Sequence, residues 1–217
     1  MSIDFFKILG NLSSFIVIIP LLLSITKFKS LNTIQIRLLH LLILVFIVES
    51  ISNILWRKKI NNLPVYHFFT VIQFLLIINI YREVLSYIYS KSFFIIIGIG
   101  FIIFAIINTV FLQNLYTFNS NATTVLGVLV VFFSLSYFYV LLKEAKYSPL
   151  ENNPMFWINS GFLIYFSSSL ILFYINNSMF KGSTEASYLV WGLHAVVNIV
   201  LMIFYTVAIA VKPDKQF

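Results

Sequence analysis

The sequence predicts an all-α, polytopic membrane protein, a single seven-transmembrane-helix bundle that covers residues 1–217. The first observation is composition: 60% of the residues are hydrophobic and 10% are charged, whereas soluble domains carry about 25% charged residues. The second is a mean hydropathy of +0.98. The third is a series of seven long apolar runs. Such a small share of polar side chains cannot cover a surface exposed to water. We therefore expect most of these helices to face lipid.

The seven apolar runs have the length that a membrane-crossing helix requires. About 20 residues, rising about 1.5 Å each, cross the ~30 Å of a bilayer's hydrocarbon. Strands of a membrane barrel would be about 10 residues long and would alternate strictly, which these runs do not. The predicted helices cover about residues 5–25, 36–55, 64–81, 93–112, 122–142, 154–175 and 188–211.

Prolines and polar linkers punctuate these runs. Pro20 lies inside the first run and predicts a kink or an early end of that helix. This run is expected to be a retained helix, because no small-x-small cleavage pattern follows it. Pro64 and Pro154 stand at the starts of the third and sixth runs, where a missing N–H costs nothing. The polar segments 148–154 and 176–187 separate the last three helices.

The basic residues predict an orientation in a bacterial inner membrane. Cytoplasmic loops carry an excess of Lys and Arg, so nine basic residues against five favour an N-terminus outside and a C-terminus inside. The richer side holds Lys27, Lys29, Arg37, Arg82, Lys91, Lys143, Lys146, Lys212 and Lys215. The other side holds Lys7, Arg57, Lys58, Lys59 and Lys181.

Several function classes are excluded at this stage. The chain has no cysteine, which rules out disulfides and thiolate chemistry. The net charge of +7 is accounted for by short loops beside the helices, so nucleic-acid binding is not expected. The last helix contains no lysine for a retinal Schiff base. No cofactor is expected, and a non-enzymatic role is favoured over an enzymatic one.

Glu49 is the most informative residue, because it interrupts the apolar stretch "ILVFIVESISNILW" (43–56). A carboxylate near the centre of a membrane helix costs about 2.5–3.5 kcal/mol to insert, so it needs compensation or a function. Asn53 follows one turn later on the same helical face. The alternative is that Glu49 is a neutral acid hydrogen-bonded to a neighbouring helix.

Other polar residues lie at a similar depth on other helices. Counting from the helix ends, Glu49 is about 10 Å in, His194 about 9 Å in and His67 about 5 Å in, all in one half of the bilayer. If their helices are neighbours, these side chains converge on a polar site inside the membrane. The predicted ligand-binding residues are Glu49, Asn53, Tyr66, Gln73, Tyr165, His194 and Asn198.

Three functions stay open. The favoured one is sensing or transport of a small molecule or ion; seven spans suggest sugar transporters of the SWEET type, although the expected internal repeat does not align. The second is an intramembrane metal-dependent hydrolase, with Glu49, His67 and His194 as metal ligands. Its final helix reads "HAVVN" (194–198), where the alkaline-ceramidase and adiponectin-receptor superfamily has H-x-x-x-H. The third is an accessory or effector protein that assembles with a partner protein or with itself.

Two segments, "NLPVYHFFTVIQFLL" (62–76) and "NPMFWINSGFLIYFSSSLILFYI" (153–175), together with the glutamate-bearing second helix, carry a resemblance. They resemble a group of uncharacterised small seven-span integral membrane proteins of Bacteroidota-type bacteria. This resemblance covers most of the chain and implies a protein of the bacterial cytoplasmic membrane. It implies no activity, cofactor or site.

Overall fold

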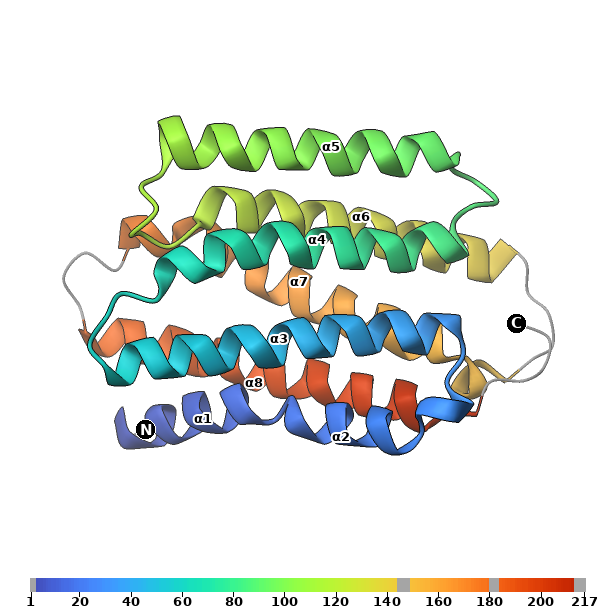
Figure 1. Ribbon diagram of the computed structural model, residues 1–217, viewed down its shortest axis with the longest axis horizontal. Helices are drawn as coiled ribbons and strands as arrows, with labels where there is room; N and C mark the ends of the chain where they lie inside the picture. Colours follow the sequence, from blue (N-terminus) through green and yellow to red (C-terminus); the bar gives the residue numbers. More distant parts are fainter. Residues whose placement is uncertain (1–2, 144–148, 180–183, 213–217) are drawn as a thin grey trace.

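The computed structural model describes residues 3–143, 149–179 and 184–212, and every regular element in these ranges is helical. The long helices run side by side along the long axis of the molecule (Figure 1). Their bounds are α1 (Ile3–Phe15), α2 (Ile18–Thr26), α3 (Thr33–Arg57), α4 (Leu63–Val84), α5 (Lys91–Ile107), α6 (Ser120–Lys143), α7 (Pro154–Met179) and α8 (Thr184–Ala210).

The first predicted helix is broken in two, as its proline predicts. The helix is interrupted at Ile16 and Val17, and Pro20 lies in the first turn of α2. A proline ring clashes with the carbonyl four residues earlier and removes the N–H that would bond to it. That carbonyl belongs to Ile16, so the break falls where the backbone cannot continue as a regular helix.

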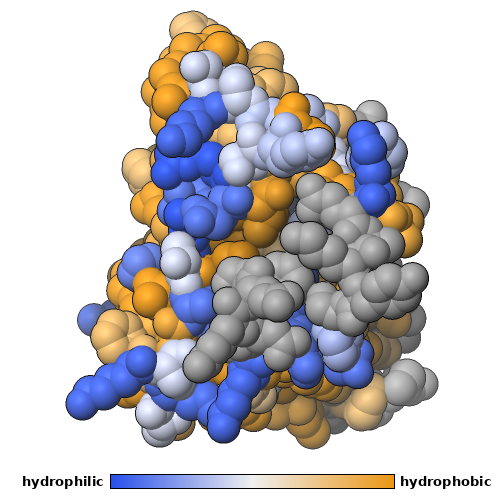
Figure 2. Space-filling model, turned by 90° about the vertical axis from the view of Figure 1, so that its right-hand side faces the viewer, coloured by the Kyte–Doolittle hydropathy of each residue, from blue (hydrophilic) through white to orange (hydrophobic). Residues whose placement is uncertain are grey.

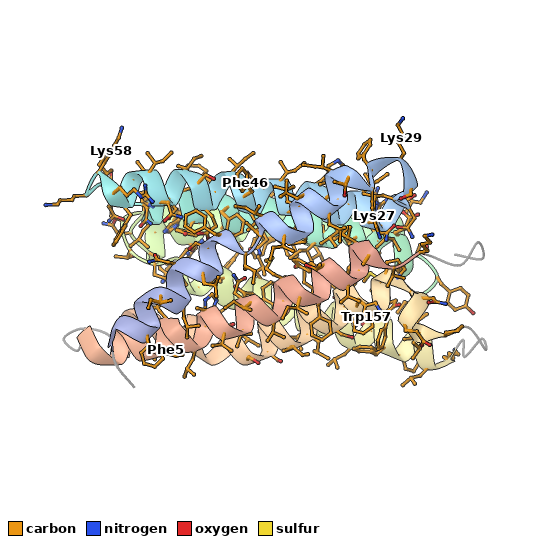
Figure 3. All side chains as sticks on the ribbon, turned by 90° about the horizontal axis from the view of Figure 1, so that it is seen from below. Phe5, Lys27, Lys29, Phe46, Lys58 and Trp157 are labelled. Carbon is orange, nitrogen blue, oxygen red and sulfur yellow. The ribbon has the colours of Figure 1, made fainter. Side chains whose placement is uncertain are left out.

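The described residues contain six helices that are long and apolar enough to cross a membrane. Large apolar side chains such as Phe46 are exposed between the two ends of the bundle, where Lys58 marks one end and Lys27 and Lys29 the other (Figure 3). Figure 2 looks onto the second of these ends, where hydrophilic residues gather with hydrophobic residues at the margins. An apolar belt between two polar ends is the surface that a lipid-embedded bundle requires.

The packing of the helices places most of the core around α4, α6, α7 and α8. Helix α7 packs against both α6 and α8, while α1 and α2 pack along α8. Helix α3 packs mainly on α4, and α5 lies at the edge of the bundle against α4 (Figure 1). The space enclosed by α1, α3, α4, α7 and α8 is therefore near the centre of the molecule.

The start of α3 is tied to the end of α8. Asn32 accepts a hydrogen bond from the backbone of Gln35, whose side chain in turn accepts from the backbone of Asn32, so the helix begins with a capping box. The Gln35 amide also donates to the carbonyl of Ala208, at 2.8 Å. Lys27 donates to the carbonyl of Ala210, at 2.7 Å. These two side chains satisfy carbonyls that the last turn of a helix leaves without partners.

A buried hydrogen-bond network joins α4, α6 and α7. The Tyr81 hydroxyl lies 2.7 Å from the Ser134 hydroxyl and donates to the side-chain oxygen of Asn159, also at 2.7 Å. The Asn159 amide donates to the Ser134 carbonyl, at 3.3 Å. Tyr81, Ser134 and Asn159 are all fully buried. Because hydrocarbon offers no replacement partner, this network favours one mutual arrangement of the three helices.

Replacing Tyr81 by Phe is expected to lower the free energy of unfolding by about 0.6–1.7 kcal/mol, the range measured for hydrogen bonds between membrane helices. The variant keeps the ring but leaves the Asn159 oxygen without the Tyr81 donor. Unfolding in mixed detergent micelles measures the change. Tyr87→Phe is the matched control, because that side chain is 74% exposed. Equal stability of the two variants would contradict a stabilising network.

Two glycines allow α8 to approach its neighbours closely. A Cβ on Gly161 of α7 would lie 2.9 Å from the Phe204 Cβ and 3.1 Å from a Leu201 methyl group. A Cβ on Gly192 would overlap the ring of Phe6 on α1. Small residues at such positions let membrane helices gain van der Waals contact along their backbones.

Candidate functional site

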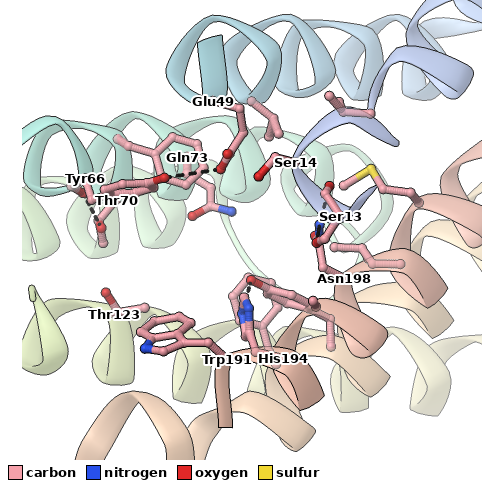
Figure 4. A pocket seen from close by; sticks show the side chains of 18 of the residues that line it. Ser13, Ser14, Glu49, Tyr66, Thr70, Gln73, Thr123, Trp191, His194 and Asn198 are labelled. Carbon is pink, nitrogen blue, oxygen red and sulfur yellow. Dashed lines mark hydrogen bonds between the residues drawn. The ribbon is translucent and has the colours of Figure 1, made fainter. Parts of the chain in front are cut away.

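A cavity of about 310 Å³ lies between α1, α3, α4, α7, α8 and the connection between α5 and α6. Figure 4 shows polar side chains from several of these helices pointing into it. Six of the seven residues predicted to bind a ligand line this cavity: Glu49, Tyr66, Gln73, Tyr165, His194 and Asn198. Glu49 and His194, which were expected at a similar depth, therefore lie on the same cavity.

Asn53 is the predicted site residue that does not line the cavity, although it shares a helical face with Glu49. Its side-chain amide donates to the backbone carbonyl of Glu49, at 2.9 Å. This bond, four residues back along the same helix, uses one of the two N–H groups of the Asn53 amide. Asn53 therefore shares the Glu49 face of α3 without lining the cavity, and its ligand-binding role stays a prediction.

The carboxyl group of Glu49 has few partners. The Tyr66 hydroxyl is 3.4 Å from Glu49 Oε1 and only 3.0 Å from the Ser52 hydroxyl. A hydroxyl has one hydrogen to donate, so the shorter contact to Ser52 competes with the longer one to Glu49. The Ser14 hydroxyl of α1 points toward the same carboxyl group (Figure 4). Among the described residues, no Lys or Arg forms a salt bridge with Glu49.

His194 and Tyr165 form the opposite wall of the cavity. The Tyr165 hydroxyl and His194 Nε2 are 3.0 Å apart, which links α7 to α8. The ring of Trp191 lies edge-on to the His194 ring, with 5.4 Å between the centroids. Tyr165 and Phe166 also meet edge-on, at 4.9 Å. This wall is therefore largely aromatic, and in it the Tyr165 hydroxyl and His194 Nε2 are engaged with each other.

Helix α1 contributes residues that the sequence analysis missed. Ser13 accepts a hydrogen bond from the Asn198 amide, at 2.8 Å, and this bond holds α1 against α8. It leaves the neighbouring Ser14 facing the cavity. The signal for them in the sequence is the pair of adjacent serines, Ser13 and Ser14, inside the first apolar run. The other lining residues that were not assigned a ligand-binding role include Phe69, Thr70, Phe118, Thr123 and Trp191.

His67 does not join Glu49 and His194, so the three do not form the metal set considered from the sequence. His67 Nδ1 lies 3.2 Å from the Thr109 hydroxyl and Nε2 lies 3.1 Å from the Thr117 carbonyl. One residue after Tyr66, the ring points about 100° around α4, toward the α5–α6 connection instead of the cavity. In the part of the chain that the structure describes, no group of three or more His, Asp or Glu residues is arranged to hold a metal ion.

The α5–α6 connection closes one side of the cavity. The predicted helix 93–112 ends as an α-helix at Ile107 and continues as a π-helical turn over Asn108–Leu112. The buried Asn108 amide bonds to Gln113 and Asn119, which stabilises the wider turn and the loop that follows. That loop places Phe118 on the cavity, edge-on to Trp191 at 5.5 Å.

No protein-family model matches this sequence, and no match is found among curated proteins or among solved structures. The chemistry of the cavity therefore has to be argued from its own residues. They provide one carboxyl group, one bonded His–Tyr pair, several hydroxyl and amide groups and an aromatic lining.

Proposed function

We propose that this chain is a seven-span protein of a bacterial inner membrane that binds a small molecule or ion in its central cavity, for sensing or transport. The observation that carries this proposal is a cavity-lining carboxyl group, Glu49, with no salt-bridge partner among the described residues. An acid inside a membrane bundle is costly, so a partner that compensates for it is expected. A bound ligand or ion is the partner that an open cavity allows.

The size and lining of the cavity support binding of a small molecule. Its volume of about 310 Å³ lies at the lower end of the ~300–1,000 Å³ range of small-molecule sites. Such sites combine a mostly apolar lining with a few polar groups that fix the ligand's orientation. Glu49, Gln73 and Ser14 supply such groups on one side of the cavity. They face the wall that contains Trp191 and His194 (Figure 4).

A direct test compares Glu49→Gln with Glu151→Gln, which removes an exposed carboxyl group instead. Thermal unfolding of the purified protein is measured against a panel of metal ions and of cationic, anionic and uncharged small molecules. At least one member is expected to raise the melting temperature of the wild type and of Glu151→Gln but not of Glu49→Gln. A panel in which no stabilisation depends on Glu49 contradicts the proposal.

The seventh span of the proposed topology is α7. Its 26 residues match the length of the six membrane-compatible helices, and it packs between α6 and α8. The described basic residues are also unequally divided between the two ends of the bundle. One end holds Lys7, Arg57, Lys58 and Lys59, and the other holds Lys27, Lys29, Arg37, Arg82, Lys91, Lys143 and Lys212. This imbalance supports an N-terminus outside and a C-terminus inside.

Single cysteines test this orientation cleanly, because the chain has none of its own. Ile60 is 52% exposed in the α3–α4 connection, and Tyr87 is 74% exposed in the α4–α5 connection. In intact spheroplasts, a membrane-impermeant maleimide is expected to label Ile60→Cys and to label Tyr87→Cys only after permeabilisation. The reverse pattern would mean the opposite orientation. Labelling of both positions in intact spheroplasts would contradict the proposal that α4, which joins the two connections, crosses the membrane.

A further inference from the structure

We propose that the occupant of the cavity is a small organic cation of the alkylammonium class, with Glu49 as its counter-ion. This inference rests on the proposed function and narrows it to one chemical class. It depends on three features of the cavity, namely the sign of its charge, the nature of its walls and its volume.

The charge of the lining favours a cation. Among the described residues around the cavity, Glu49 supplies the carboxyl group and no Lys or Arg is present. His194 is already engaged with the Tyr165 hydroxyl. An anion would therefore meet a carboxyl group and no positive charge, at a depth where desolvated like charges repel strongly. A cation instead pairs with a carboxyl group that has no salt bridge to any described residue.

The walls favour an organic cation over a metal ion. The cavity is lined by aromatic side chains, among them Tyr66, Phe69, Phe118, Tyr165 and Trp191. Aromatic rings attract ammonium groups through their π faces. A small hard cation instead requires a close shell of several oxygen ligands. The described residues contain no cluster of acidic or histidine side chains that would provide the core of such a shell.

The volume supports the same choice. The cavity of about 310 Å³ has room for several water molecules or for a small organic molecule. A single metal ion would leave most of this space to be filled by water against aromatic rings, which is unfavourable. An alkylammonium ion would occupy more of this space and place methyl or methylene groups against those rings.

Gln73 provides a second polar point of recognition. Its side chain lies beside Glu49 at the cavity (Figure 4), and no hydrogen bond to it is present among the described residues. An amide can both donate and accept, so it suits a hydroxyl group on the ligand. A hydroxylated alkylammonium, with its charged head at Glu49 and its hydroxyl at Gln73, satisfies both side chains at once.

The experiment uses probes that differ in charge but not in shape. Choline and its uncharged isostere 3,3-dimethylbutan-1-ol, together with tetraethylammonium, are titrated into the purified full-length chain by calorimetry. At least one of the two ammonium probes, choline or tetraethylammonium, is expected to bind. The uncharged isostere of choline, 3,3-dimethylbutan-1-ol, is expected to bind at least tenfold more weakly than choline. Glu49→Gln is expected to remove this preference for the charged probe, whereas Glu151→Gln keeps it.

The aromatic contribution is tested at Trp191. Trp191→Ala is expected to weaken binding of the ammonium probe by about two- to thirtyfold, the range of a cation–π contact, and Trp191→Phe by less. Phe111→Ala is the control, because that ring is 77% exposed outside the cavity. The melting curve of each variant shows whether it is folded before titration.

The outcomes separate this inference from the proposed function. If a metal ion or an uncharged or anionic compound stabilises the protein through Glu49 while both ammonium probes fail to bind, the ammonium inference is wrong and the proposed function stands. Binding of the uncharged isostere as tightly as choline has the same consequence. If no compound of any class binds in a manner that depends on Glu49, both proposals are wrong.

Discussion

Replacing Glu49 by Gln is expected to make the ligand-free protein more stable, by about 1–3 kcal/mol. The substitution removes a carboxyl group that has no salt bridge among the described residues and whose contact with the Tyr66 hydroxyl is long, at 3.4 Å. Inserting such a group into a membrane is costly. Functional sites retain such unfavourable groups because binding requires them. The melting temperature measured without ligand should rise by a few degrees, while the stabilisation that a ligand provides is lost.

Glu83→Gln provides a contrast for this prediction. Glu83 forms a salt bridge with Arg37, with 2.6 Å between the guanidinium nitrogen and the carboxylate oxygen. The Glu83 side chain is 45% exposed. Its replacement should therefore lower stability, by no more than about 1 kcal/mol. A loss of stability in Glu49→Gln that equals or exceeds the loss in Glu83→Gln would mean that Glu49 is a structural residue, and the binding proposal would lose its basis.

Gly161→Ala is expected to lower the free energy of unfolding by about 1–3 kcal/mol, the usual cost of overpacking. The added methyl group would lie 2.9 Å from the Phe204 Cβ, which is fixed to the backbone of α8 and cannot rotate away. Helices α7 and α8 must then separate. Because Tyr165 is one turn further along α7, the separation should also lengthen its 3.0 Å contact with His194 and weaken ligand binding.

Gly100→Ala is the matched control, since it makes the same substitution within an apolar helix where no neighbouring atom lies within 4 Å. It should be neutral or should raise stability slightly, because alanine favours the helix over glycine. Denaturation of both variants under identical detergent conditions gives the comparison. Similar effects of the two substitutions would contradict a close α7–α8 contact at Gly161.

The helices could be predicted from the sequence because the signals that indicate a helix lie within the segment that forms it. Apolar runs of sufficient length and the prolines at their starts indicate the elements directly, and the clash between Pro20 and the Ile16 carbonyl is itself a local effect. The end of α5 was not predictable in this way. Its π-helical turn depends on bonds from Asn108 to Gln113 and Asn119, which form only when the following loop folds back.

Residue spacing indicated which side chains could meet, but not which of them line the cavity. Counting residues from helix ends placed Glu49 and His194 in one layer of the bundle, and both line the same cavity. Spacing could not tell whether Tyr66 or its neighbour His67 faces that cavity, since this depends on which helix lies on each side of α4. The same limit explains the assignment of Asn53 to the site and the omission of Ser13 and Ser14, whose roles depend on how α1 packs against α8.

The most direct test of a cation-binding cavity uses the absence of native cysteine. Gln73→Cys places a thiol in the cavity, and Ile203→Cys places one on an outward-facing position that is 55% exposed. Each variant is treated with two methanethiosulfonate reagents of similar size, one carrying a trimethylammonium group and the other a sulfonate group. The reaction rate of each reagent with the protein is divided by its reaction rate with a free thiol in solution. We expect Gln73→Cys to react faster with the cationic reagent, and Glu49→Gln in the same chain to abolish that preference. Equal rates with both reagents, or no reaction beyond that of Ile203→Cys, would contradict a water-accessible cavity in which Glu49 attracts a cation.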